Sequence, residues 1–151
     1  MEVFNGSIDS KYNSQKILVA DKELITALDL KFYLERLGLN VLPIINQGAK
    51  LISEAVNEKP GLIITDTQLD GKDNGVTAIT NLTDRFYIPY IFLTTSAKFN
   101  YRNYSKKLNP LAVMQKPIDY TKLLFYINKC LHPSNSESIN RSNMQPVSSN
   151  C

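Results

Sequence analysis

The chain has no tryptophan, one histidine, two cysteines and no long apolar run. With only Cys130 and Cys151, it offers neither a disulfide framework nor a cysteine metal cluster, so we expect a reducing, cytoplasmic setting. No segment is long enough to span a bilayer, and the first residues lack the pattern of a signal peptide. The net charge of +3 is small and dispersed. We therefore expect neither a membrane nor a nucleic-acid partner.

The composition predicts one domain between two polar ends. Hydrophobic residues make up 43% of the 151 residues and charged residues 21%, which is ordinary for a globular domain. Residues 1–15 are polar and lack periodicity, so we expect a flexible N-terminal extension. Residues 133–151 are rich in serine and asparagine and bury too little apolar surface to order, so we expect a disordered tail. The globular domain is then residues 16–132.

Short apolar runs alternate with amphipathic segments throughout this domain. We expect strands at 16–21, 40–45, 61–65, 90–93 and 112–115, and helices at 24–37, 48–57, from 75 onward, 100–108 and 120–131. The segment 100–108 is polar and only weakly amphipathic. The alternation predicts an α/β fold, a doubly wound parallel sheet with helices on both faces. Pro43 cannot donate to a strand ladder, so the second strand is expected at an edge.

Four of the expected strands end in polar side chains, in the order Asp21, Asp66, Thr94 and Lys116. Asp66 follows the apolar run of residues 61–65 and precedes a turn-rich stretch. Open α/β sheets place their chemistry at the carboxyl ends of the strands. If the strands are parallel and adjacent, the four groups meet at one edge of the sheet.

These groups are sufficient for a phosphoaspartate switch. A carboxylate is a weak nucleophile, but a divalent cation beside it neutralises the oxygens of an incoming phosphoryl group. A hard cation needs oxygen ligands, which two carboxylates and a nearby backbone carbonyl can supply. We assign this site, for Mg²⁺, to Asp21, Asp66 and Gln68. Thr94 and Lys116 can hold the remaining phosphoryl oxygens.

Residues 16–131 resemble the receiver domain of two-component response regulators. The resemblance is carried by residues 17–21, by Asp66 with Leu69 and Gly71 downstream, by Leu93-Thr94, and by Lys116-Pro117. Each mark is weak alone, but their order and spacing are specific. The resemblance implies a flavodoxin-like five-stranded sheet in the order 2-1-3-4-5, which agrees with the edge position expected from Pro43.

The resemblance also implies a role for each strand-end residue. Asp66 is then the phosphoacceptor, Asp21 a metal-site acid, Thr94 the switch hydroxyl and Lys116 the phosphoryl-binding lysine, with a cis peptide before Pro117. The chain is expected to be a phosphoprotein of phosphorelay signal transduction. Its phosphoryl donor would be a sensor histidine kinase or a histidine phosphotransfer protein.

Such a domain is a signalling module and not an enzyme, and at most assists its own phosphorylation and dephosphorylation. Its output to a downstream protein target would come from contacts of the fourth helix, fifth strand and fifth helix, a region that could also form a homodimer. Because only a short polar tail follows Leu131, we expect either a stand-alone receiver or the receiver part of a longer protein.

Three residues depart from the family pattern. Lys22 replaces the second of two adjacent acids, which removes a metal ligand, adds positive charge and should weaken Mg²⁺ binding. The next acid, Glu23, is expected to begin the helix and point elsewhere. Val113 stands where the family has a mobile aromatic residue. Thr95 is larger than the family favours and would narrow access to Asp66.

Alternative functions follow from these departures. The chain could be a pseudo-receiver, an interaction module that phosphate does not switch, and Lys22 supports this alternative. Lys22 itself is either a solvated loop residue or a partner of Asp66. A flavodoxin-like cofactor domain has the same topology but needs a glycine-containing phosphate loop after the first strand. Residues 21–24 contain no glycine, so this third function is disfavoured.

Overall fold

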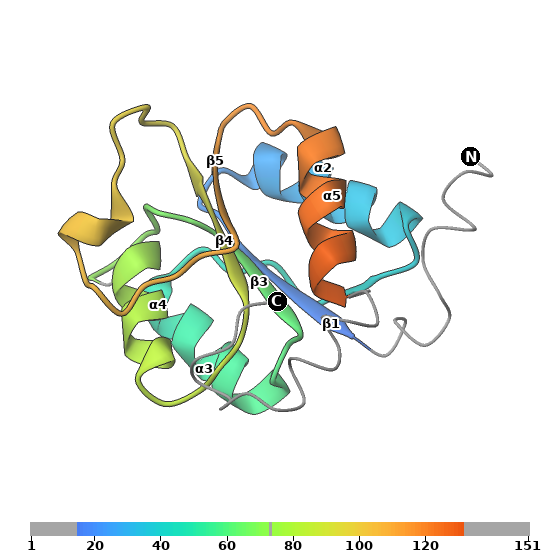
Figure 1. Cartoon of the computed structure of the whole chain (residues 1–151). Coiled ribbons are helices and arrows are strands. Elements are labelled where there is room, and N and C mark those ends of the chain that lie inside the picture. Colours follow the sequence, from blue (N-terminus) through green and yellow to red (C-terminus); the bar gives the residue numbers. More distant parts are fainter. Residues whose placement is uncertain (1–14, 73, 132–151) are drawn as a thin grey trace.

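A parallel five-stranded sheet in the order β2-β1-β3-β4-β5 forms the centre of the molecule (Figure 1). The structure is a computed structural model and describes residues 15–72 and 74–131. The strands are β1 (Lys16–Ala20), β2 (Asn40–Val41), β3 (Leu62–Asp66), β4 (Tyr90–Thr94) and β5 (Ala112–Gln115). The order confirms the predicted fold. The expected tail, His132, and all of the expected extension but Gln15 lie outside the described residues.

Helices cover both faces of the sheet, as a doubly wound fold requires. They are α2 (Leu24–Arg36), α3 (Gly48–Glu58), α4 (Gly75–Thr83) and α5 (Tyr120–Leu131). In Figure 1, α2 and α5 lie on one face and α3 and α4 on the other. Each pair closes its own apolar core against the sheet. None of the helices within residues 15–72 and 74–131 has the length and hydropathy to cross a bilayer.

The strands differ in burial according to their place in the sheet. Every residue of β3 and β4 is buried, and four of the five in β1 are. Strands with helices on both sides read as continuous apolar runs, which is why the sequence reveals them. In β5 only Met114 is buried, because this strand lies at the edge. Because the strands are parallel, the carboxyl ends of β1, β3, β4 and β5 all lie at the same end of the sheet, which we call its carboxyl edge.

The second strand is shorter than the sequence predicts. We expected it to cover residues 40–45, but β2 comprises only Asn40–Val41. It lies at the sheet edge, as Pro43 predicted, and the ladder stops just before the proline because this residue has no N–H to donate. Beyond it, Ile45 rejoins β1 through an isolated bridge to Ala20.

The helix predicted at residues 100–108 is absent, and this prediction is wrong. The segment contains only a short 3₁₀ helix, η2 (Tyr101–Asn103). Polar side chains of this segment accept hydrogen bonds from backbone N–H groups that a helix would need for its own hydrogen bonds. Asn100 Oδ1 accepts from Arg102 N at 3.0 Å, and Ser105 Oγ accepts from Lys107 N at 3.1 Å. Such local bonds compete with helical hydrogen bonds, which leaves β4 and β5 joined by an irregular segment.

Helix α2 buries a narrower face than its sequence suggests. Of the apolar residues spaced three or four apart along α2, Ala27, Leu30 and Leu34 are buried, but Leu24 is 61% exposed. The exposed face of α2 carries large apolar side chains at Leu24, Ile25, Leu28 and Phe32. The helix begins directly beside the carboxyl edge of the sheet, so this apolar surface borders the candidate site.

Candidate functional site

The candidate site lies at the carboxyl edge of the sheet, where β1, β3 and β5 end, with β4 between β3 and β5. It brings together Asp21, Asp66 and Lys116. Lys116 Nζ lies 2.8 Å from Asp21 Oδ2 and 2.5 Å from Asp66 Oδ2. The register explains this meeting, because Ala20 pairs with Thr65 and Asp66 with Leu93 in neighbouring strands. The peptide bond between Lys116 and Pro117 is cis, as the resemblance implied.

Asp66 is buried and held by the backbone around it. The residue is 5% exposed, and its Oδ1 accepts a hydrogen bond from Gln68 N at 2.8 Å. Thr65 Oγ1 donates to the Asp66 carbonyl oxygen at 2.9 Å. Helix α4 packs so closely here that a Cβ atom at Gly75 would lie 1.8 Å from the same carbonyl oxygen. The turn after β3 therefore fixes one carboxylate oxygen and leaves Oδ2 facing Lys116.

Asp21 is also buried, and burial acts against its charge. Its Oδ1 accepts from Glu23 N at 2.9 Å, which forms a tight turn between β1 and α2. Its Oδ2 lies near the Lys116 ammonium but has no hydrogen-bond partner among the described residues. Burial raises the pKa of Asp21 above its usual value, and Lys116 counteracts part of this rise. Asp21 thus carries an oxygen that is paired by charge alone.

Lys116 is the cation at the centre of the site. Its side chain is only 8% exposed and contacts Asp21, Asp66 and Glu23. Burial disfavours the charged ammonium, but the three carboxylates outweigh this effect and raise the pKa of Lys116. Lys116 is therefore firmly protonated in this arrangement.

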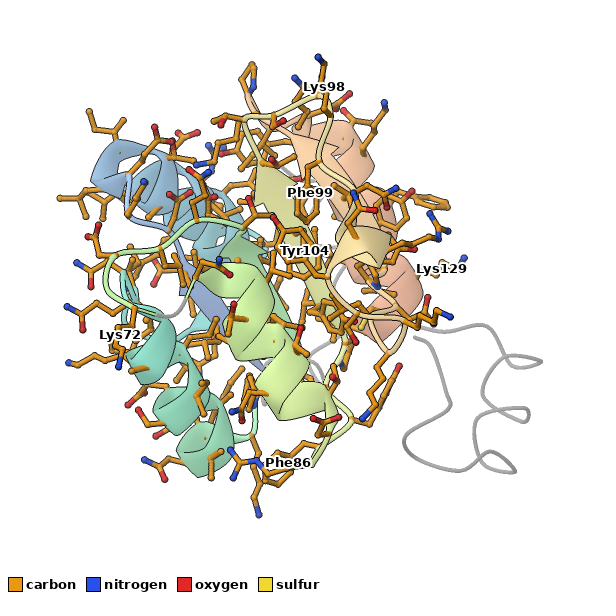
Figure 2. The ribbon with its side chains drawn as sticks, turned by 90° about the vertical axis from the view of Figure 1, so that its left-hand side faces the viewer. Lys72, Phe86, Lys98, Phe99, Tyr104 and Lys129 are labelled. Carbon is orange, nitrogen blue, oxygen red and sulfur yellow. The ribbon has the colours of Figure 1, made fainter. Side chains whose placement is uncertain are left out.

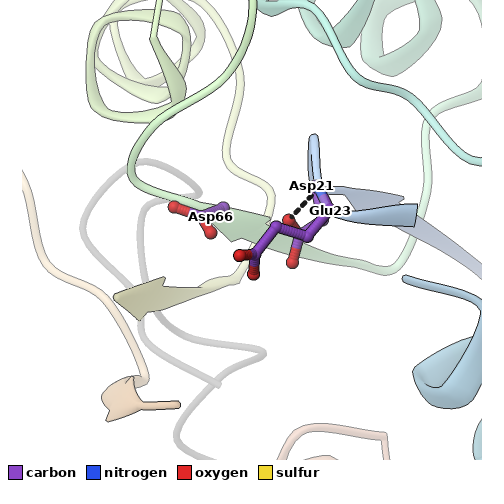
Figure 3. A group of neighbouring side chains, drawn as sticks. All are labelled: Asp21, Glu23 and Asp66. Atoms are coloured by element: carbon purple, nitrogen blue, oxygen red, sulfur yellow. Dashed lines mark hydrogen bonds between the residues drawn. The ribbon is translucent and has the colours of Figure 1, made fainter. Parts of the chain in front are cut away.

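Glu23 lies in the site, contrary to the expectation from the sequence. We expected it to point elsewhere, but its Oε1 accepts from Lys116 Nζ at 2.7 Å. Figure 3 shows Glu23 turned toward the same space as Asp21 and Asp66. The hydrogen bond with Lys116 lowers the pKa of Glu23. The sequence did contain a signal for this position. Glu23 is a carboxylate two residues after the strand-end Asp21 and at the N-cap of the next helix.

Lys22 takes no part in this cluster. The residue is exposed, and within the described residues no ion pair joins it to Asp66. Of the two interpretations of Lys22, the structure supports the solvated loop lysine. The Lys22 charge nevertheless contributes to lowering the pKa of Glu23, after the larger effect of Lys116.

Thr94 and Gln68 border the cluster. Thr94 is buried, its carbonyl accepts from Lys116 N at 2.8 Å, and its Oγ1 accepts from Ser96 N at 3.0 Å. The hydroxyl is thus tied to the loop that follows β4. Gln68 and Thr95 are exposed. Both line a polar depression of about 310 Å³ between the turn after β3 and the segment after β4.

Three carboxylates could hold a divalent cation. Oxygen atoms of Asp21, Glu23 and Asp66 all lie within 4.8 Å of one another. All of these groups offer oxygen ligands, which a hard divalent cation prefers. The buried Asp21 Oδ2, which accepts no hydrogen bond from a described residue, fits a cation ligand. The donor set therefore suits Mg²⁺.

The sheet order and this edge define a doubly wound α/β domain with a buried phosphoacceptor-type cluster of two aspartates and a lysine. The family model of the response regulator receiver domain matches residues 17–128, well over half of the chain. The chain therefore belongs to this family of phosphorelay signalling domains. Receiver domains typically bind Mg²⁺ through acidic residues, and this structure has such a group of acids.

Individual relatives agree with the family. The chain is 35% identical over 82 residues to the phyllosphere-induced regulator PhyR of Methylorubrum extorquens, covering 52% of the chain and 30% of that protein. It is 22% identical over 110 residues to the transcriptional regulatory protein PdtaR of Mycobacterium tuberculosis, covering 73% of the chain and 53% of that protein. The chain thus spans about half or less of the curated relatives it matches.

Solved structures share the fold. The receiver domain of a modulated diguanylate cyclase from Desulfovibrio desulfuricans has a TM-score of 0.70 at 26% identity, with 78% of this chain and 93% of that chain covered. PhyR from Brucella abortus has a TM-score of 0.68 at 22% identity, with 87% and 55% covered. The second likeness shows the fold alone.

Proposed function

We propose that the chain accepts a phosphoryl group on Asp66 from a phosphohistidine of a sensor kinase or a phosphotransfer protein. The observation that carries this proposal is the contact of the Lys116 ammonium with Asp66 at 2.5 Å and with Asp21 at 2.8 Å. A buried carboxylate beside a fixed cation at the carboxyl edge of a parallel sheet is suited to receiving an anionic group.

The proposed transfer involves Asp66, Lys116 and Thr94. The phosphorus–nitrogen bond of the phosphohistidine breaks as phosphorus bonds to an Asp66 carboxylate oxygen. The electron pair stays on the imidazole nitrogen, which takes a proton from water. Lys116 and the Thr94 hydroxyl then donate to phosphoryl oxygens. Catalysis of this step is mostly positioning and electrostatics, so the domain acts as an acceptor and not as a general enzyme.

The proposed cofactor is Mg²⁺, weakly bound. When bound, a divalent cation neutralises charge that develops on the phosphoryl oxygens. Asp21, Asp66 and Gln68 are the ligands that the sequence predicts, and Lys22 removes one ligand that the family supplies. We expect Lys22→Asp to tighten Mg²⁺ binding, because it adds a carboxylate and removes a positive charge. Identical affinity in a calorimetric titration of both proteins would show that position 22 faces away from the site.

The second candidate is a pseudo-receiver, favoured by one observation. Lys116 already contacts three carboxylates, so the lysine and each of these acids has a partner of opposite charge without a metal or a phosphoryl group. In that case the fold serves as an interaction module. Labelling of Asp66 separates the two functions.

The proposed output is a protein contact made through β5 and α5. A depression of about 520 Å³ lies between them, and Val113 and Phe125 in its lining are 39% and 60% exposed. A downstream protein or a second copy of the chain would bind here. We also propose that residues 16–132 form the folded unit and that it works in the cytoplasm.

The decisive experiment is intact-mass measurement after incubation with a small phosphodonor and Mg²⁺. We expect one added phosphoryl group, stable in acid and labile in base, and none in Asp66→Asn. Asp70→Asn is the matched control, because Asp70 lies in the same turn but is exposed. Equal labelling of Asp66→Asn and the original chain would refute the assignment. An unlabelled original chain would favour the pseudo-receiver.

A further inference from the structure

The acid missing at position 22 has a structural counterpart one residue later. Lys22 is exposed, whereas Glu23 reaches Lys116 Nζ at 2.7 Å. The oxygens of Glu23 lie within 4.8 Å of those of Asp21 and Asp66. The edge therefore has three carboxylates, although its sequence has lost one of the two adjacent acids after β1.

The turn between β1 and α2 explains how Glu23 reaches the site. Glu23 is the N-cap of α2 and has extended backbone angles, φ −87° and ψ 100°. Its N–H donates to Asp21 Oδ1 at 2.9 Å, which closes a tight turn between β1 and α2 (Figure 3). The longer side chain of glutamate then spans the extra distance that a residue one position later must cover.

The charge balance suits a divalent cation. Three carboxylates and the Lys116 ammonium leave two negative charges at this edge. Asp21 Oδ2 is buried, and Lys116 Nζ lies 2.8 Å from it as an ion-pair partner without the geometry of a hydrogen bond. The Glu23 side chain is 53% exposed, so it can move toward a cation without repacking the core. Without Glu23, only one net negative charge would remain, which is a poor match for Mg²⁺ or Mn²⁺.

We propose that Glu23 is a metal ligand of this receiver and replaces the acid that Lys22 displaced. This inference rests on the proposed function, since the cation would serve phosphoryl transfer to Asp66. It predicts that affinity for a divalent cation depends on Glu23. The dependence is measurable without any phosphorylation.

The test is a titration of the full chain with Mn²⁺ at pH 7, in which electron paramagnetic resonance measures the free Mn²⁺. It is carried out on the original chain and on Glu23→Gln. We expect the dissociation constant to rise at least about tenfold in Glu23→Gln, because loss of even an outer-shell partner of a metal ligand typically costs about 10–100-fold in affinity. Glu58→Gln is the matched control, because Glu58 also binds a lysine, Lys16 at 2.9 Å, but lies outside the site. Its affinity should equal that of the original chain.

A second variant tests equivalence of the two positions. Lys22→Asp combined with Glu23→Gln moves the carboxylate back by one residue and should recover the original affinity within a few fold. Circular dichroism checks that each variant is folded.

Unchanged or tighter Mn²⁺ binding in Glu23→Gln would overturn the inference, because Glu23 would then only compete for Lys116. Absence of Mn²⁺ binding to the original chain, or a double variant that stays weak, would overturn it as well. Phosphoryl labelling of Asp66 is a separate measurement, so failure of this inference and failure of the proposed function are distinguishable.

Discussion

Two neighbouring regions of the molecule are held by different forces. At the charged edge, Asp21, Asp66 and Glu23 surround Lys116 in buried or half-buried ion pairs. Between β4 and β5, residues 95–111 are held by local side-chain-to-backbone bonds and by aromatic contacts. The first region is preorganised by long-range charge pairing, whereas the second can rearrange at low cost.

Thr94 joins the two regions. Its carbonyl is bound by Lys116 N, and its hydroxyl accepts from Ser96 N. In the segment after Thr94, the ring of Phe99 packs edge-on against the ring of Phe92, with 5.8 Å between the ring centroids. The ring centroid of Phe99 also lies 5.8 Å from that of Tyr104 (Figure 2). Val113 on β5 has no ring to relocate. We therefore expect a signal at Asp66 to pass through the loop after Thr94 and not through β5.

The largest expected effect is the loss of the central cation. Lys116→Met leaves buried Asp21 and Asp66 without a partner charge, which should reduce the free energy of unfolding by about 3 kcal/mol at neutral pH. Lys107→Met is the control, because the pair of Lys107 with Asp84 is exposed at 70% and 48% and should contribute less than about 0.5 kcal/mol. Urea unfolding measures both, and equal losses would mean that the charged edge is not preorganised.

Gly75 tests the packing behind the phosphoacceptor. A Cβ there would meet the Asp66 carbonyl oxygen at 1.8 Å, so Gly75→Ala must shift the backbone and should destabilise the fold by about 2 kcal/mol. At Gly71 nothing lies within 4 Å, but its φ of +90° disfavours alanine, so Gly71→Ala should lose only about 1 kcal/mol. Thermal unfolding of both variants checks the order, and the reverse order would contradict the close packing at Asp66.

Substitutions in the segment between β4 and β5 should reduce the free energy of unfolding less than Lys116→Met or Gly75→Ala does. Phe99→Ala removes a half-buried ring from Phe92 and Tyr104, and we expect a loss of about 1.5 kcal/mol in unfolding free energy. Because the ion pairs do not involve Phe99, Mn²⁺ affinity should stay unchanged. A change in metal affinity in this variant would show that the two regions are coupled in the resting state.

Asp21→Asn should have the smallest effect on stability, and it should stabilise the fold, whereas the preceding substitutions destabilise it. The pKa of Asp21 is raised by burial, so the folded chain binds its proton more tightly than the unfolded chain does. Stability is therefore lost as pH rises from the usual value of 3.8 through the folded value. Asp21→Asn avoids this loss and should melt about 2–5 °C higher at neutral pH in metal-free buffer. The gain should vanish below about pH 3.8; a gain that persists there would not come from the charge.

The sequence predicts the sheet and most of the site for clear physical reasons. Buried central strands give continuous apolar runs, and parallel strands bring their carboxyl ends together, so Asp21, Asp66 and Lys116 could be placed without coordinates. Strand β2 has only two residues, so no alternating pattern could predict its length. Pro43 predicted only that the strand lies at a side of the sheet. The roles of Asp66, Thr94, Lys116 and Gln68 in phosphoryl transfer stay predictions.

Two features escaped the sequence because local hydrogen bonds determine them. The direction of Glu23 depends on the turn in which Asp21 Oδ1 binds its N–H, and periodicity does not report this turn. The missing helix at residues 100–108 depends on Asn100 and Ser105 binding nearby backbone N–H groups. Weak amphipathicity was the only available signal for the second feature.

The most direct test of the difference between the two regions is a comparison of amide chemical shifts with and without a beryllofluoride mimic and Mg²⁺. A phosphoryl mimic shifts the population only through its different affinity for two conformations. If Thr94 turns toward the mimic, its bond with Ser96 N breaks, so we expect the largest changes at Asp66 and from Thr94 to Tyr104, and small changes on β5 and α5. Changes on β5 and α5 as large as those around Thr94, or no binding of the mimic, would contradict this mechanism.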